Sequence, residues 1–222
     1  MSSPTAARPG DAAARRTAVV VAGHRGDSAT VRAHIDDGDA AVRSSAISAL
    51  VRLGEFHDDD LVMALDDIGT ARRAIELSAH HGTGVTAIDD RLRTLVVGQD
   101  ADLAEVAVWA LGERWQELGD EPGGAVVIGV IESAARRHDD ALVREAAVAA
   151  LGAIGASRSI PVIIDALNDK ATVRRRAVIA LAPFDGPEVR AALATARGDR
   201  DWQVRQAAED LSDPDPPEND AG

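Results

Sequence analysis

The sequence of 222 residues contains no cysteine and no tyrosine, and it has only two phenylalanines and three tryptophans. Without cysteine the chain cannot form disulfides, thiolate metal sites or cysteine nucleophiles, which fits a reducing compartment such as the cytoplasm. Aromatic residues make up 2 % of the chain, so alanine, valine, leucine and isoleucine supply nearly all of its apolar mass. A β-sandwich or barrel would need more aromatic and β-branched alternation, so the composition favours small-residue helices that pack closely.

Long apolar runs and an excess of positive charge are also missing. The longest apolar run near the N-terminus covers residues 18–22, which is too short to cross a bilayer, and we expect no signal peptide and no membrane association. The 37 acidic residues outnumber the 24 basic ones, which gives a formal charge of −13. Because such a chain repels a phosphate backbone on average, we expect no nucleic-acid partner.

A short motif recurs along the chain, and it consists of an aspartate, a Val-Arg pair, spaced alanines and a closing Ala-Leu. Its clearest copies occupy residues 39–50 and 140–151, and each continues to a glycine, Gly54 or Gly155. Weaker copies follow the same register around a central alanine. These central alanines are Ala18, Ala46, Ala74, Ala107, Ala147, Ala177 and Ala208. They lie 28 to 40 residues apart, which is the spacing of a repeat built from two helices.

Each copy of the motif predicts a helix. The aspartate can cap the free N–H groups of the first turn, apolar residues follow at steps of three and four, and glycine ends the helix. Shorter apolar segments between the copies predict the other helix of each pair, and they cover residues 28–36, 58–65, 85–97, 125–135, 160–167 and 188–196. A single hairpin of this size cannot bury its apolar stripe, so we expect the hairpins to stack, with the alanine column allowing close approach.

This pattern resembles the HEAT repeat family, in particular the short bacterial type related to bilin lyases. The resemblance covers about residues 11–211. It implies an all-α fold, an α-α superhelix of about six helical hairpins with an N-terminal capping helix. It also implies a ladder of Asp–Arg hydrogen bonds between successive repeats, in which Arg43, Arg144, Arg174 and Arg205 take part and which Ala104 interrupts. The ends differ in composition, so we expect residues 1–10 and the acidic tail 212–222 to be disordered.

Several residue clusters invite a chemical interpretation, but none has the spacing of a catalytic or metal site. Histidines lie beside aspartates at His57 and His138, where helix capping explains the aspartates. The His-Glu pairs of di-iron HEAT hydroxylases and the Gly-x-Ser-x-Gly elbow of hydrolases are both missing from the sequence. We therefore expect no catalytic residues, no metal site and no cofactor.

One stripe of the second helices varies from repeat to repeat and is mostly polar. It contains the positions equivalent to Ser44, Ser48 and Arg52, which are four residues apart and share a helix face. The resemblance implies that second helices line the concave side. The residues of the stripe that we expect to contact a partner are Arg72, Glu76, His80, Glu105, Trp109, Glu113, Glu145 and Arg175. Trp109 stands out because acids flank it at four-residue steps; it is either an exposed anchor for a basic partner or a residue tucked over the adjoining repeat.

These observations predict a non-catalytic interaction or scaffold module, monomeric and cytoplasmic, that binds a protein or peptide on its concave helical face. A basic partner would suit the acids around Trp109. Two enzymatic alternatives come with the resemblance: a chaperone or enzyme like the bilin lyases, and a HEAT-like DNA glycosylase. The charge of −13 argues against the glycosylase. Repeat folds host unrelated functions, so the fold alone does not choose among them.

Overall fold

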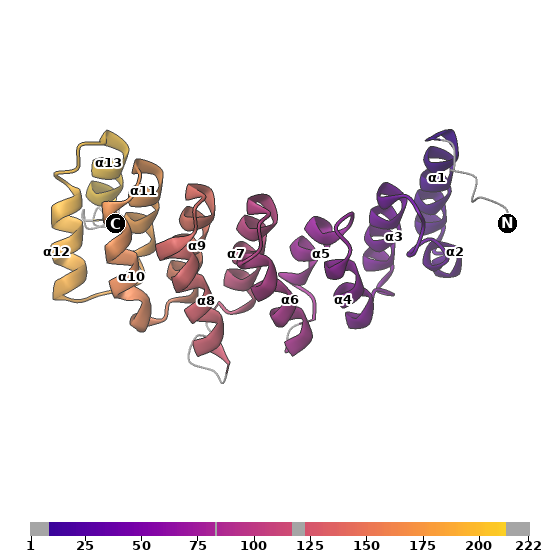
Figure 1. Cartoon of the computed structure of the whole chain (residues 1–222), viewed down its shortest axis with the longest axis horizontal. Coiled ribbons are helices and arrows are strands. Elements are labelled where there is room, and N and C mark those ends of the chain that lie inside the picture. Colours follow the sequence, from indigo (N-terminus) through magenta and orange to yellow (C-terminus); the bar gives the residue numbers. More distant parts are fainter. Residues whose placement is uncertain (1–8, 83, 117–122, 212–222) are drawn as a thin grey trace, which may run out of the picture. The chain divides into compact units, whose positions relative to one another are not determined.

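A computed structural model of the chain describes residues 9–82, 84–116 and 123–211. In these ranges the fold is all-helical, with thirteen α-helices, two short 3₁₀ turns and no strand (Figure 1). The first helix, α1 (Pro9–Arg25), begins two residues before the predicted repeat region. Residues 1–8 and the tail 212–222, which were expected to be disordered, lie outside the described residues. No helix in the described ranges combines the length and the apolar character needed to cross a bilayer.

The helices follow the predicted order of one capping helix and then six hairpins. After α1, the even-numbered helices are the first helices of the hairpins and the odd-numbered ones are the second helices, which carry the repeated motif. The chain divides into two compact units, residues 1–91 and 92–222, and the division falls inside α6 (Thr86–Val96). The predicted repeat region 11–211 therefore extends over both units.

The first unit contains α1, α2 (Ser28–Arg32), α3 (Ala40–Leu53), α4 (Asp58–Asp66) and α5 (Ala71–Ser78). The motif-bearing helices α1 and α3 lie side by side, and α2 packs against both of them. Their contact buries a cluster of small apolar residues. The members of this cluster are Val19, Ala22, Val31, Val42, Ala46, Ala49 and Leu50.

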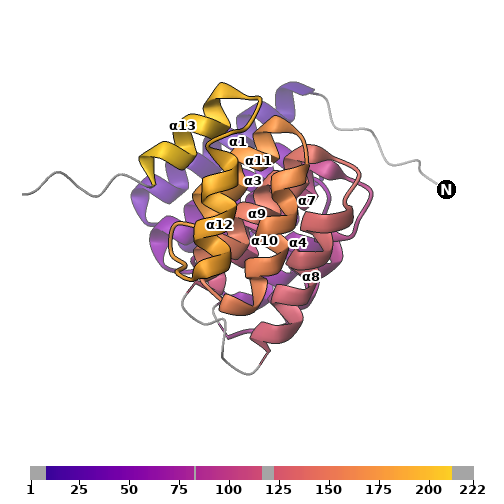
Figure 2. The same ribbon diagram turned by 90° about the vertical axis from the view of Figure 1, so that its left-hand side faces the viewer.

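The second unit contains α7 (Ala101–Arg114), α8 (Gly124–Arg137), α9 (Ala141–Ile154), α10 (Ile160–Asp165), α11 (Ala171–Ala180), α12 (Pro187–Ala196) and α13 (Trp202–Asp210). Its second helices form one row, in which α7 packs on α9, α9 on α11 and α11 on α13 (Figure 1). The first helices α8, α10 and α12 form another layer, and Figure 2 shows both layers from the α12–α13 end. The largest fully buried side chains include Leu111, Ile128, Ile131, Leu151 and Leu181.

The ends of the second helices confirm the predicted capping. The carboxylate of Asp39 accepts hydrogen bonds from the backbone N–H groups of Ala41 and Val42, and Asp140 accepts one from Leu142. Gly54 and Gly155 end α3 and α9 with φ of 71° and 72°. That left-handed conformation is open to glycine at little cost, which explains why a glycine follows both of the clearest motif copies.

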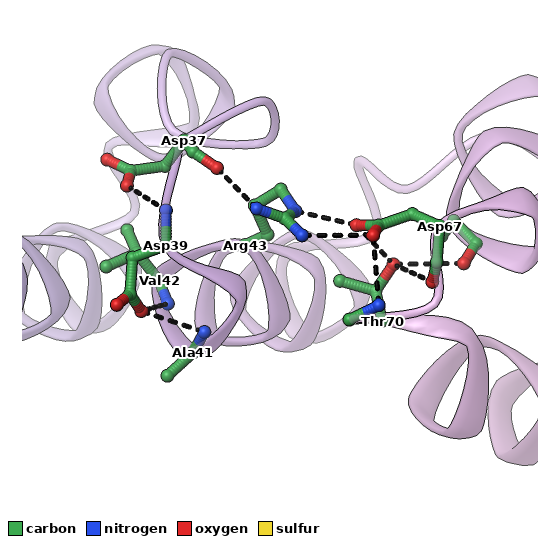
Figure 3. A network of polar contacts seen from close by, with 9 residues as sticks. Asp37, Asp39, Ala41, Val42, Arg43, Asp67 and Thr70 are labelled. Carbon is green, nitrogen blue, oxygen red and sulfur yellow. Dashed lines mark hydrogen bonds and ion pairs between the residues drawn. The ribbon is translucent and has the colours of Figure 1, made fainter.

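The Asp–Arg ladder is present, and its acceptors are aspartates of the turns that precede the second helices. Arg43 of α3 donates through Nε and Nη2 to the carboxylate of Asp67 at 2.6 and 3.0 Å, and through Nη1 to the carbonyl of Asp37 (Figure 3). Arg15 makes the same bidentate pair with Asp37. Each arginine therefore links its own hairpin to the next one by bidentate, charge-assisted bonds, which are stronger than neutral hydrogen bonds.

The second unit carries a second run of the ladder. Arg144 pairs with Asp169, Arg174 pairs with Asp199, and Arg205 donates to the carbonyl of Asp199. Arg43, Arg144 and Arg174 are thus confirmed as ladder arginines, whereas the bond of Arg205 joins it to the turn of its own hairpin. The ladder positions in α5 and α7 hold Ala71 and Ala104, both buried.

A histidine replaces the acceptor aspartate where no arginine is present to pair with it. The Nδ1 atom of His138 accepts the backbone N–H of Asp140 at 3.1 Å. The carboxylates of Asp37 and Asp199 accept the same backbone bond from Asp39 and Asp201. By register, the arginine that would face His138 stands at position 104, which is alanine. The turn therefore keeps its local hydrogen bond without placing an unpaired carboxylate beside the helix row.

Candidate functional site: a groove between α7 and α9

A groove of about 360 Å³ lies between the second helices α7 and α9 and is bounded at one end by α11. We call it the α7–α9 groove. Its lining residues are Glu105, Val106, Trp109, Gly112 and Glu113 of α7; Leu142, Glu145, Ala146, Ala149, Ala150 and Ala153 of α9; and Arg176 of α11. Trp109, its two flanking acids and Glu145, which come from the predicted contact stripe, thus lie around one groove.

Trp109 forms the aromatic wall of the groove. It stands in the middle of α7, and 41 % of its surface is exposed, so it is an exposed residue and not a core residue. Glu105 and Glu113 lie one helical turn before and after it on the same face. A ring placed between two carboxylates in this way presents a π face and negative charge to the same ligand.

Small residues open the groove and hold its two helices close together. Gly112 lies against Ala150, and a Cβ built on this glycine would come within 2.8 Å of the alanine Cβ. Three further alanines of α9, Ala146, Ala149 and Ala153, line the groove, so α9 does not fill the space beside the indole. The helices therefore approach each other closely at Gly112 and Ala150, two of the residues that line the groove.

The charges of the groove are only partly balanced. Glu145 pairs with Arg176, with 3.3 Å between Oε1 and Nη2. Among the described residues, no hydrogen bond or ion pair involves the carboxylate of Glu105 or of Glu113. These two acids can therefore accept hydrogen bonds from a ligand without first breaking bonds within the protein.

The other predicted contact residues lie elsewhere. Arg72, Glu76 and His80 belong to the first unit, and Glu76 is engaged by Arg72 at 3.8 Å and by Arg73 at 3.2 Å. Arg175 lines a smaller hollow of about 230 Å³ between α11 and α13, together with Ile179 and Trp202. Trp202, the first residue of α13, is 65 % exposed there.

Six groove residues lie outside the predicted stripe, and Leu142 and Arg176 are the two that add a large apolar side chain and a charge. Leu142 is 58 % exposed, and Arg176 pairs with Glu145. Leu142 lies three residues before Glu145, so the same helix-face argument could have included it. Arg176 comes from the next hairpin, and only the stacking of α9 on α11 brings it to the groove.

The two histidines that lie beside aspartates in the sequence, His57 and His138, both lie at or just before the starts of helices. His57 caps α4, where its backbone N–H donates to the carboxylate of Asp60 at 3.0 Å, and His138 holds the turn before α9. In the described ranges, no group of three or more His, Asp and Glu side chains is arranged so that it could hold a metal ion.

Comparison with known proteins identifies the family. The sequence profile of the HEAT repeats matches residues 88–182 and 128–212, together more than half of the chain. Comparison with curated proteins gives no significant match. Among solved structures, the Escherichia coli protein YibA is similar to this chain with a TM-score of 0.58 and 17 % identity, over 94 % of this chain and 75 % of YibA.

Two engineered structures are also similar. One, described as an engineered protein, has a TM-score of 0.56 and 18 % identity, over 83 % of this chain and 94 % of its own. The other is a designed armadillo repeat protein in complex with the peptide (KR)4, with a TM-score of 0.54 and 17 % identity, over 89 % of this chain and 96 % of its own. These likenesses show an armadillo-like helical repeat fold. With its family match, its stacked hairpins and its Asp–Arg ladder, the chain belongs to the HEAT repeat family.

Proposed function

We propose that the chain is a non-catalytic interaction module and that the α7–α9 groove binds a segment of a partner protein that carries a basic side chain. The observation that carries this proposal is the exposed ring of Trp109 between Glu105 and Glu113, two carboxylates that form no hydrogen bond or ion pair with the described residues. An arginine or lysine over the ring would gain a cation–π interaction of about 0.5–2 kcal/mol. The flanking carboxylates would accept its N–H groups.

The apolar half of the groove suits the rest of such a segment. Leu142 and the alanines of α9 can cover the aliphatic stem of the basic residue or a neighbouring apolar side chain. The designed armadillo repeat protein of similar fold was solved with a peptide of alternating lysine and arginine. That example supports the chemistry by analogy only, because the likeness between the two chains is one of fold.

The kind of partner and the setting are part of the same proposal. The charge of −13 supports a protein partner over nucleic acid, and the absence of cysteine supports a reducing compartment such as the cytoplasm. We propose that the protein acts as a monomer. The predicted contacts Arg72, Glu76, His80 and Arg175 remain additional candidates outside this groove.

Binding of a labelled peptide of alternating lysine and arginine tests the proposal. We expect Glu105→Gln with Glu113→Gln to weaken binding about tenfold at low salt, because two charge-assisted contacts are lost. Trp109→Leu should weaken binding roughly fivefold, because it removes a cation–π interaction of about 1 kcal/mol. Trp109→Phe keeps an aromatic ring and should keep part of the affinity.

The matched control removes the same charge elsewhere in the second unit. Glu188→Gln with Glu209→Gln changes two exposed glutamates outside the groove, and it should alter the affinity by less than about twofold. If both double variants weaken binding equally, the peptide responds only to net charge and the groove is not its site.

A further inference from the structure

A second groove, in the first unit, has the opposite charge. It lies between α1 and α3, has a volume of about 580 Å³, and is lined by Arg16, Val20, His24, Ser45, Ser48 and Arg52 among others. We call it the α1–α3 groove. No Asp or Glu is among the described residues that line it, although the chain as a whole carries a charge of −13. Ser48 and Arg52 belong to the variable stripe of the sequence, but they are not among the predicted contacts.

The two arginines of this groove reach across it from opposite helices. Arg16 of α1 donates through Nε to Oγ of Ser45 on α3 at 3.1 Å, and the Ser45 hydroxyl donates to the carbonyl of Ala41. Arg52 of α3 lies over Gly23 of α1, where an added Cβ would come within 3.2 Å of its Nη2. The missing side chain of Gly23 thus leaves room for the Arg52 guanidinium.

Both guanidinium groups keep donors for a ligand. Arg16 uses one N–H for Ser45, and Arg52 donates to the carbonyl of Ser48 at 3.3 Å. Neither forms an ion pair within the described part of the chain. A guanidinium has five N–H donors, so most of those on Arg16 and Arg52 are available.

Other charges around the groove are already balanced. Arg73 of α5 donates to Oγ of Ser48 but also pairs with Glu76 at 3.2 Å. The ladder arginines Arg15 and Arg43 are bound to Asp37 and Asp67. The charge that the groove offers therefore comes from Arg16 and Arg52, with His24 near Arg52.

The spacing of the two arginines points to the shape of the ligand. Arg16 is held at Oγ of Ser45, and the Arg52 guanidinium donates to the carbonyl of Ser48, three residues further along α3. Three residues of helix rise about 4.5 Å. In an extended chain, side chains two residues apart lie on the same face, roughly 6.6 Å from each other, so such a pair can face both guanidinium groups.

We propose that the α1–α3 groove binds an extended acidic segment of a partner protein, in which two carboxylates two residues apart reach Arg16 and Arg52. The charge of the groove, the open donors and the spacing all favour this ligand. The site is independent of the α7–α9 groove, because it uses different helices, a different unit and the opposite charge.

Fluorescence anisotropy with a labelled peptide of sequence Gly-Glu-Ala-Glu-Gly tests the proposal on the full chain at low salt. We expect saturable binding that weakens about tenfold for each arginine removed, in Arg16→Gln and in Arg52→Gln. The control Arg136→Gln with Arg190→Gln removes two exposed arginines of other helices, which pair with Asp165 and Asp185, and it should change affinity by less than about twofold.

Two peptide controls work on the unaltered protein, so they do not depend on the folding of any variant. The Gln-Ala-Gln version should bind at least about tenfold more weakly. A version with adjacent glutamates should also bind more weakly than the spaced one, because adjacent side chains point to opposite faces of an extended chain. The proposal is wrong if the unaltered protein does not bind the acidic peptide, if the spacing of the glutamates makes no difference, or if the double control variant loses as much affinity as Arg16→Gln or Arg52→Gln.

Discussion

At the residue scale, the ladder shows which roles can be assigned from sequence and which cannot. The arginines could be identified because each follows a valine at a fixed place before the central alanine. Their acceptors could not, because two aspartates stand close together in most turns. Asp67 and Asp169 align with the capping aspartates in the sequence, yet in the structure they are ladder acceptors. Only the distance to the previous hairpin distinguishes a capping aspartate from a ladder aspartate.

The ladder should make stability depend on acidity. The hydrogen bond from Arg15 lowers the pKa of Asp37 from 3.8 to about 2, and the ladder arginines likewise lower the pKa of Asp67, Asp169 and Asp199. Because the pKa is lower in the folded state, the stabilisation is present above pH 3.8 and is lost as the pH falls toward 2.

The variant Asp37→Asn isolates this effect. At pH 5 it should unfold at a lower urea concentration than the unaltered protein. The difference between the two urea midpoints should narrow between pH 4 and pH 2 as Asp37 becomes protonated. The control Asp185→Asn changes a fully exposed carboxylate and should leave the pH dependence unchanged. If the difference between the two urea midpoints stays constant down to pH 2, the charge of the Arg15–Asp37 pair does not contribute to stability.

Trp109 shows the limit of sequence analysis for the site. The register placed it on the variable stripe with its acids, but it left open whether the ring is exposed or covered. The exposure of the ring depends on the side chains that α9 presents to the groove, and Ala149 and Ala153 of α9 are too small to cover an indole. Those neighbours come from another hairpin, so the stacking decides the exposure.

At the scale of elements, the hairpins could be predicted closely because apolar spacing, capping aspartates and closing glycines agree. The predicted segment 58–65 is α4 (Asp58–Asp66), and 188–196 is α12 (Pro187–Ala196). Two first helices end before the predicted segment does and pass into a tighter turn. The segment 28–36 ends as a helix at Arg32 and continues as a turn, and 160–167 passes into a 3₁₀ turn after Asp165. Apolar spacing does not distinguish these tighter turns from α-helix.

Close packing of the second helices gives a prediction with an internal control. A Cβ on Gly152 of α9 would lie 2.8 Å from both the Cα and the Cβ of Ala180 on α11. Gly152→Ala should therefore lower the free energy of unfolding by about 1–3 kcal/mol, because the two backbones must move apart. On α8, a Cβ on Gly129 would meet nothing within 4 Å, and Gly129→Ala should stabilise by about 0.5–1 kcal/mol.

Urea unfolding of both variants measures the difference. Both changes replace a helical glycine by alanine, so they share the same gain in helix propensity, and only the contact with α11 differs. Stabilisation by both substitutions would show that α9 and α11 do not approach as closely as described.

At the scale of the whole molecule, the family and the proposed sites rest on different kinds of observation. The HEAT profile begins at residue 88, so the repeats of the first unit are supported by the motif register and by the structure. The charge of −13 suggests a uniformly acidic surface, but the groove of one unit is cationic and that of the other is anionic. Net charge could not predict this difference between the grooves. The charge of each groove depends on which charged side chains are already paired within the protein.

The most direct test of the account follows the three tryptophan indole N–H signals by NMR while a peptide of alternating lysine and arginine is added. Trp109 lies in the α7–α9 groove, Trp115 ends α7, and Trp202 lies in the hollow with Arg175. Single Trp→Phe variants assign the signals. The account predicts that the Trp109 signal shifts saturably while that of Trp202 stays in place. A shift confined to Trp202, or no saturable shift of Trp109, would contradict it.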